Sequence, residues 1–263
     1  MGRHAILFHA HYLKDLRVTE PIIHDHFEGF IERQDHALAI GTAVGAWSWF
    51  VYDVDPAPHK GSGRRPDRQP IELDLPNRPY VASIRRTFQA LIPRVPEAMK
   101  LDCIVDGRID YPAARAHAKF KDRVRLRVYP NVKRGPKGTP RSDEAVARDF
   151  AMFPADSLHQ FVRHSNSEHK RETISFGRRL ESILGRAYLM AIWKNFIKGR
   201  SERRPDHTTP AMWLGLTETS WRWERIFARR LFRERIRPSN AALRLYRKRW
   251  TRHLPELDRK HAA

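Results

Sequence analysis

The stretch that decides the fold of this chain is Thr19–Phe50, which reads TEPIIHDHFEGFIERQDHALAIGTAVGAWSWF. Its first part is apolar and rich in residues that favour strands, yet it contains Asp25. A carboxylate inside a buried strand is unfavourable unless a cation or a set of hydrogen bonds replaces its lost hydration. We therefore expect Asp25 to bind a metal ion; the alternative is that a shorter strand ends at this residue.

Three short strands in series are predicted around this acid. The segments Ile22–Ile31, Ala37–Val44 and Trp47–Val54 favour strands, and Gly41 and Gly45 mark a bend and a turn. Short links between successive strands favour an antiparallel meander.

Beyond the meander, helical and strand patterns alternate. The segment 55–79 is rich in proline and basic residues, which predicts a loop. The further predicted elements are a helix over 81–92, a strand over 100–105 that ends at Asp106, a helix over 111–120, a strand over 124–129, a basic loop over 130–142, a helix from Ser142 to Phe150 and a helical stretch over 157–197. This order predicts an α/β fold of the ribonuclease H-like type, with a mixed sheet flanked by helices.

The composition divides the chain into two parts. We expect the ribonuclease H-like domain over 1–200 and a basic, aromatic, helical extension over 201–263. From residue 198 onward there are 18 Lys and Arg against 7 Asp and Glu, with four of the seven Trp. The whole chain of 263 residues has a net charge of +20, which favours a polyanionic partner such as nucleic acid. The alternative is an Arg-rich surface that is merely solvated.

Composition also disfavours several classes of protein. The single cysteine, Cys103, excludes a disulfide framework and a Cys-rich zinc site. No run of about 18 apolar residues is present, so we expect no membrane-spanning helix and a cytoplasmic location.

Three acidic residues are candidate ligands for a divalent metal. Mg²⁺ prefers carboxylate oxygens, and a pair of such ions can activate one oxygen and stabilise another in phosphoryl transfer. Asp25 lies within the first strand, Asp106 closes the fourth, and Glu172 shares a helical face with an apolar stripe. We predict these three as catalytic residues and as ligands of Mg²⁺ or Mn²⁺. The alternatives are a turn at Asp106, a surface ion pair at Glu172, and Asp156 as the third ligand, although Asp156 at a helix start is also an ordinary N-cap.

Two basic regions are candidate DNA contacts. They contain Lys133, Arg134, Lys137 and Arg141 in the loop over 130–142, and Arg229, Arg230, Arg233, Arg247 and Lys248 in the C-terminal part. Aromatic side chains interleaved with the second group would add base stacking to phosphate contacts. The alternative is an amphipathic helix whose aromatic side chains pack on the core.

Several short motifs follow one another in a particular order. They are Asp25 to Phe30, Asp106-Gly107 followed by Tyr111, Arg171-Glu172-Thr173, Trp193-Lys194-Asn195-Phe196, and Thr209-Pro210-Ala211-Met212 followed by Gly215-Leu216. Over roughly residues 20–235, this order resembles the catalytic domain of bacterial insertion-sequence transposases of the DDE type.

This resemblance implies a ribonuclease H-like fold, with Mg²⁺ or Mn²⁺ held by Asp25, Asp106 and Glu172. It also implies a nucleoid-associated homo-oligomer that cuts and joins double-stranded DNA at transposon ends and target. Such transposases usually carry an N-terminal DNA-recognition module, whereas 24 residues precede Asp25 here. We therefore expect the catalytic domain without that module. The alternatives are a degenerate remnant that only binds DNA, and a structure-specific nuclease of the same fold.

Overall fold

A computed structural model of the chain describes residues 1–60, 78–133, 135–136, 138–169, 177–201 and 207–248. The strands are β1 (Ile22–Ile31), β2 (Arg33–Gly45), β3 (Val51–Lys60), β4 (Leu101–Val105) and β5 (Val124–Val128). The α-helices are α1 (Gly2–Leu13), α2 (Pro79–Leu91), α3 (Asp110–Arg115), α4 (Asp143–Ser165), α5 (Leu180–Ile192), α6 (Pro210–Trp213), α7 (Trp223–Ala228) and α8 (Asn240–Tyr246). None of these helices is both long enough and apolar enough to cross a membrane.

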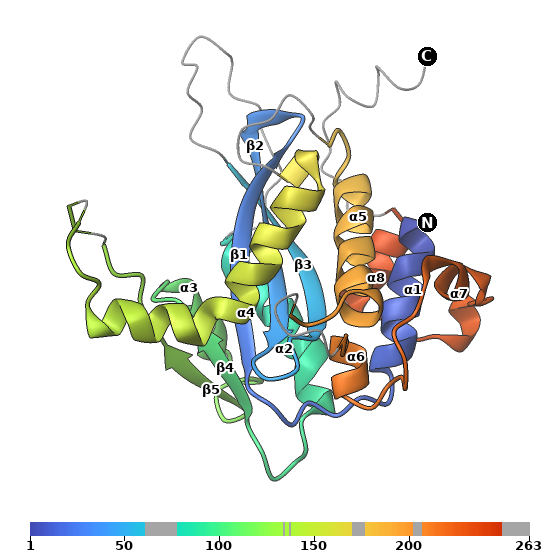
Figure 1. Cartoon of the computed structure of the whole chain (residues 1–263), viewed down its shortest axis with the longest axis horizontal. Helices are drawn as coiled ribbons and strands as arrows, with labels where there is room; N and C mark the ends of the chain where they lie inside the picture. The colour runs from blue at the N-terminus through green and yellow to red at the C-terminus, as the bar shows by residue number, and fades with distance from the viewer. Residues whose placement is uncertain (61–77, 134, 137, 170–176, 202–206, 249–263) are drawn as a thin grey trace.

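The five strands form one mixed sheet in the order β3-β2-β1-β4-β5 (Figure 1). Antiparallel pairing of β1 with β2 and of β2 with β3 confirms the predicted meander. β4 runs parallel to both β1 and β5. Parallel neighbours need a crossover connection, and α3 lies in the connection between β4 and β5. The chain is therefore an α/β protein with a five-stranded mixed sheet flanked by helices, as predicted.

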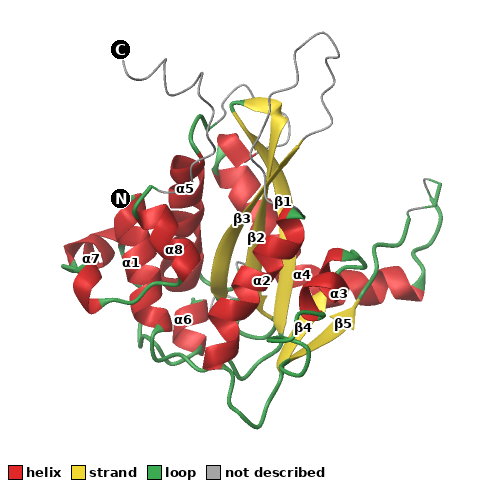
Figure 2. Cartoon of the chain, turned by 180° about the vertical axis from the view of Figure 1, so that it is seen from behind, coloured by secondary structure: helices red, strands yellow, loops and turns green. Residues whose placement is uncertain are grey.

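Helices cover both faces of the sheet (Figures 1 and 2). α4 crosses one face and contacts β1, β2 and β4, whereas α2 packs against β2 and β3 from behind. The α2 contact buries Ile84, Phe88 and Leu91, the positions whose helical spacing predicts this helix. β1 therefore lies at the centre of the sheet, with one face toward α4.

The third strand differs from its prediction at both ends. Its expected beginning forms a turn, because the buried carboxylate of Glu20 accepts the backbone N–H groups of Trp47 and Ser48 at 2.8 and 2.9 Å. β3 then continues through Pro56 and Pro58 into the predicted loop. β3 lies at the edge of the sheet, and an edge strand tolerates proline where the missing N–H would point away from its neighbour.

The first residues of the chain, which show no clear period in the sequence, form the helix α1. Residues 5–10 are all buried, and a helix buried around its circumference has no amphipathic period. α1 packs against α5 and α8. Gly2 approaches α5 so closely that an added Cβ would lie 3.0 Å from the Cα of Gly185. α8, from the C-terminal part of the chain, thus packs on the first helix.

The helix α4 is longer than the sequence predicts. It begins where expected, with Ser142 as its N-cap. It then runs through Pro154 to Ser165 instead of ending at Phe150, and Figure 1 shows it bending part-way along. Proline removes one helical hydrogen bond and commonly bends a helix without ending it when both halves are packed. The helical stretch predicted over 157–197 is consequently divided between α4 and α5.

The outer edge of β3 is covered by side chains. Asn195 accepts the N–H of Val51 at 2.7 Å and donates to its carbonyl at 3.0 Å, much as a neighbouring strand would. The ring Nε2 of His9 lies 2.9 Å from the same carbonyl, and the hydroxyl of Tyr188 donates to the carbonyl of Val54 at 3.3 Å. These bonds satisfy edge groups that could otherwise pair with another chain.

Candidate functional site

Two largely buried carboxylates lie side by side near the centre of the sheet. Asp25 is in the middle of β1, and Asp106 directly follows β4. The two strands are parallel and pair Ile23 with Ile104, an offset of 81 residues that also relates Asp25 to Asp106. Residues in register on adjacent strands point to the same face, and the strands are about 4.8 Å apart. Both carboxylates therefore face α4.

These two carboxylates line a cavity of about 670 Å³ between the sheet and α4. The other residues that line it are His26, Glu28, Arg108, Asn131, Arg148, Asp156, His159, Gln160, Arg163 and His164. All of them are polar. The cavity thus combines carboxylates, which bind metal cations, with guanidinium groups, which bind phosphate.

Burial makes the charged form of Asp25 unfavourable. Loss of hydration, followed by the nearby charge of Asp106, raises the pKa of Asp25 from 3.8 to about 7. The backbone N–H of His26, which donates to Asp25 Oδ1 at 2.8 Å, and the charge of Arg148 offset part of this effect. A divalent cation beside Asp25 would favour the charged carboxylate.

Asp106 is oriented by the turn that follows β4. Its Oδ1 accepts the backbone N–H of Arg108 at 3.2 Å, and its Oδ2 accepts the side-chain amide of Asn131 at 3.3 Å. Burial raises the pKa of Asp106, while the Arg108 N–H and the positive charge of that residue lower it. These bonds hold the carboxylate at the wall of the cavity.

Asp156 lies in the interior of α4 and not at a helix start. The prediction that it is an N-cap is therefore wrong, because α4 begins at Asp143 and continues past Pro154. The carboxylate of Asp156 lines the cavity and forms an ion pair with Arg148, whose Nη1 is 2.5 Å from Asp156 Oδ2. Its charge is consequently compensated within α4.

A histidine to which the sequence assigned no role faces Asp25 from α4. The Nδ1 of His159 is 3.6 Å from Asp25 Oδ2, and its Nε2 is 2.8 Å from Thr42 Oγ1. Burial, with a smaller contribution from the charge of Arg163, lowers the pKa of His159 to about 3 and keeps the ring neutral at pH 7. The spacing of residues 156, 159 and 163 places them on one helix face, and this is the sequence signal that could have identified His159.

The side chains of Asp25 and Asp106 offer two carboxylate groups to a divalent metal ion. Asp25 and Asp106 suit Mg²⁺ or Mn²⁺, because such ions are often held by one or two carboxylates and keep several waters or substrate oxygens. Within the described part of the chain, no group of three His, Cys, Asp or Glu side chains could hold a metal ion. Glu172, predicted as the third ligand, lies outside the described residues.

The first predicted DNA-contact region extends from β5 toward α4. Lys133 is exposed, and Arg141 is engaged in an ion pair with Asp149 of α4. Arg134 and Lys137 lie outside the described residues.

The second predicted DNA-contact region lies around α7 and α8. Its exposed members are Arg229, Arg230, Arg247 and Lys248, and Arg233 is half-buried. Figure 1 places this region and the loop before α4 at opposite ends of the molecule. The two predicted regions therefore do not form one continuous patch.

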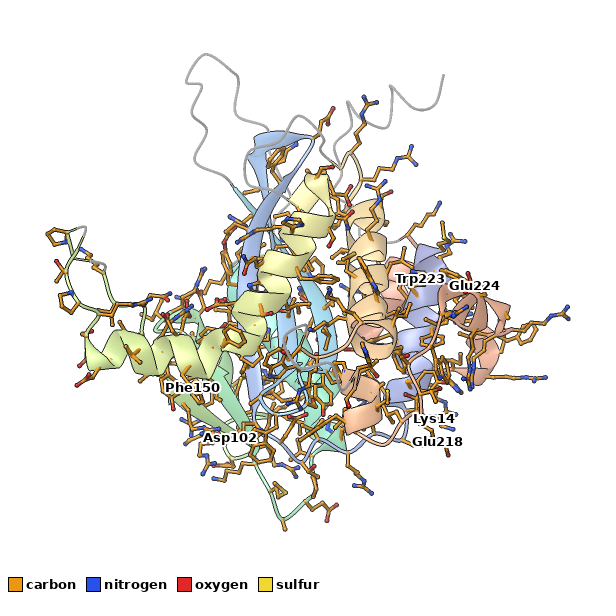
Figure 3. The ribbon with its side chains drawn as sticks, in the orientation of Figure 1. Lys14, Asp102, Phe150, Glu218, Trp223 and Glu224 are labelled. Atoms are coloured by element: carbon orange, nitrogen blue, oxygen red, sulfur yellow. The ribbon has the colours of Figure 1, made fainter. Side chains whose placement is uncertain are left out.

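A larger cavity, of about 1060 Å³, lies beside the first half of α4, and the acids that line it are Glu20, Asp102 and Asp149. Its walls include Trp47, Phe150 and Asp102, the last two of which are labelled in Figure 3. The carboxylate of Asp102 is already paired with Arg125 and Arg127, at 2.7 and 3.0 Å. The polar cavity at Asp25 is therefore the better candidate for metal-dependent chemistry.

Comparison with known proteins adds no assignment: no protein-family model, no curated protein and no solved structure matches this chain.

Proposed function

We propose that this chain is the catalytic domain of a DDE-type transposase with a ribonuclease H-like fold. The observation that carries the proposal is the placement of Asp25 within β1 and of Asp106 directly after the adjacent parallel strand β4, with both residues lining one polar cavity. The strand order β3-β2-β1-β4-β5, with β2 antiparallel to its neighbours, supports the ribonuclease H-like assignment.

The side chains of the cavity have separate roles in this proposal. Asp25 and Asp106 would hold Mg²⁺ or Mn²⁺, and Glu172 is the candidate for a further ligand. When bound, the metal supplies activation of a water or a DNA 3′-hydroxyl and stabilisation of the departing oxygen. Arg163, which lines the same cavity, would bind the phosphate under attack. His159 lies beside Asp25, with its Nδ1 3.6 Å from Asp25 Oδ2.

The reaction would be hydrolysis of a phosphodiester at the end of an insertion sequence, followed by joining of the new 3′ end to target DNA. The net charge of +20 supports double-stranded DNA as substrate. Assembly as a homo-oligomer on DNA is part of the proposal.

A second candidate is a catalytically inactive DNA-binding remnant of such an element. It is favoured by the ion pair between Asp156 and Arg148, because this pair occupies the acid that α4 offers to the cavity. In that case the cavity would bind DNA phosphate without metal-dependent cleavage.

Cleavage of supercoiled plasmid in Mn²⁺ or Mg²⁺ separates the two candidates. We expect the wild type to nick DNA, and Asp25→Asn or Asp106→Asn to reduce the rate at least about 100-fold, because a metal site supplies several kcal/mol to the transition state. Asp102→Asn, which removes a carboxylate from the same β4 strand outside this cavity, is the matched control and should retain the wild-type rate. DNA binding without nicking in either metal would favour the inactive remnant.

A further inference from the structure

A separate cavity, whose lining includes two arginines, lies on the far side of the molecule from α4, between α1 and α7. Its volume is about 550 Å³. Figure 3 labels Lys14 and Glu218 on this flank of the molecule. It is lined by His11, Tyr12, residues 215–219, Trp221, Arg225 and Arg229. None of these residues takes part in the chemistry proposed for Asp25.

Two arginines of this cavity are stacked on one tryptophan. The Cζ of Arg225 is 4.2 Å, and that of Arg229 is 5.0 Å, from the ring centre of Trp221. Arg229 also lies 5.3 Å from the ring centre of Tyr12. Trp221 is itself held in the core, because it is 5% exposed and its backbone N–H donates to the carbonyl of Phe196 at 2.8 Å. The two guanidinium groups therefore rest on a fixed aromatic platform.

Neither Arg225 nor Arg229 forms an ion pair with any acid in the described part of the chain. Glu218 is the acid that lines the cavity, and it is exposed. Two positive charges near one ring repel each other, and an anion bound between them would offset this repulsion. Stacking uses the face of a guanidinium group and leaves its N–H edge free for bidentate binding to phosphate.

The surroundings of His11 also favour the binding of an anion in this cavity. Partial burial, then the positive charges of Arg229 and Lys14, lower the pKa of His11. A neutral imidazole can still donate one N–H to an anion. The cavity thus has a positive electrostatic potential and several directed donors.

We propose that Arg225, Arg229 and His11 form a binding site for a phosphodiester group of the nucleic-acid backbone. The choice of nucleic acid over another source of phosphate rests on the proposed function. The site holds DNA at a distance from the carboxylate cavity and takes no part in bond breaking. It therefore contributes affinity that does not depend on base sequence.

The test measures binding of a labelled 20-base-pair duplex to the full chain by fluorescence anisotropy, at several NaCl concentrations. Arg225→Gln and Arg229→Gln should each reduce the slope of log K against log salt by about 1, and the double variant by about 2. Arg222→Gln is the matched control: it removes the same charge from an exposed neighbour that lines no part of this cavity, so it should change the slope by less than half as much. Unchanged melting temperatures would establish that all variants fold.

Each outcome decides the proposal. Equal effects of all three single substitutions would indicate diffuse positive charge and overturn it. Wild-type binding with no change in Arg225→Gln or Arg229→Gln would also overturn it, while leaving the cleavage test at Asp25 unaffected. A second arm measures the melting temperature in inorganic phosphate and in NaCl of equal ionic strength. If phosphate stabilises the wild type but not the double variant, and DNA does not bind, the site takes free phosphate, and the assignment to nucleic acid is overturned together with the proposed function.

Discussion

Replacing Asp25 with Asn should make the metal-free protein more stable above pH 7. The native carboxylate is buried beside Asp106, and its pKa is raised from 3.8 to about 7. A carboxyl group whose pKa is higher in the folded state binds a proton there while the unfolded chain has already lost it. Stability is therefore lost as pH rises from about 4 to about 7. An amide of the same shape has no charge to bury.

The size of the effect follows from the two pKa values. One pKa unit corresponds to about 1.4 kcal/mol, so ionisation of Asp25 destabilises the fold by up to about 4 kcal/mol above pH 7. Between pH 5 and pH 8 the loss is about 3 kcal/mol. Asparagine keeps the oxygen that accepts the N–H of His26 at 2.8 Å, so the substitution preserves that bond.

Urea unfolding in EDTA, followed by tryptophan fluorescence at pH 5 and pH 8, measures the difference. Asp53→Asn is the matched control. Burial, followed by the charge of Asp55, also raises the pKa of Asp53 to about 7, but this carboxylate bonds to Thr87 under α2 and does not line the candidate site. Both variants should lose less stability than the wild type between pH 5 and pH 8.

Adding Mn²⁺ at pH 8 separates the two variants. The metal should stabilise the wild type and Asp53→Asn by roughly 1–3 kcal/mol at ten to a hundred times its dissociation constant, and leave Asp25→Asn unchanged. The reasoning about Asp25 is refuted if Asp25→Asn in EDTA is no more stable than the wild type at pH 8. Equal stabilisation of all three proteins by Mn²⁺ would refute metal binding at this carboxylate.

Three further substitutions test the packing that positions the site, each by its urea unfolding midpoint. Glu20→Ala leaves two backbone N–H groups and a tyrosine hydroxyl without their acceptor, and should cost about 3 kcal/mol or more. Gly41→Ala places a Cβ 2.9 Å from Nε2 of His26 in β1, and should lower the free energy of unfolding by about 1–3 kcal/mol. Asn195→Leu leaves the backbone N–H of Val51 without its acceptor and the carbonyl of Val51 with His9 alone, and should cost about 2 kcal/mol and increase aggregation measured by light scattering.

A glycine in the neighbouring strand provides the control for Gly41→Ala. A Cβ added to Gly29 would lie 3.7 Å from the carbonyl of Leu38, which is an ordinary contact. If Gly29→Ala and Gly41→Ala destabilise the protein equally, the close approach of His26 to residue 41 is not the cause. A stability loss below about 1 kcal/mol for Glu20→Ala would show that water replaces the lost carboxylate.

The local pattern of the sequence was sufficient to predict the antiparallel meander and the positions of Asp25 and Asp106 relative to their strands. β1 spans Ile22–Ile31 as predicted, because its apolar residues favour a strand on their own. The apolar strand before Asp106-Gly107 is likewise β4. Side-chain alternation and turn chemistry are short-range properties, so they can be identified without knowing what packs against each strand.

Elements whose limits depend on distant contacts were predicted less well. α1 shows no period because other helices surround it, and α4 continues through Pro154 into a second half that packs on the sheet through Ala155, Leu158 and Val162. β3 extends across Pro56 because it lies at the sheet edge, which strand order alone determines. In each case a neighbour far along the chain supplies the energy that overrides local preference.

The sequence by itself determined the α/β class, the strong positive charge, and the two acids at the middle of one strand and the end of another. Tertiary structure decided that Asp25 and Asp106 are neighbours, since their proximity requires parallel pairing of β1 with β4 across 81 residues. It also decided that His159 faces Asp25, because α4 crosses that face of the sheet, and that Arg148 pairs with Asp156 within α4. The raised pKa of Asp25 belongs to this second group, because burial and a second carboxylate exist only in the folded chain.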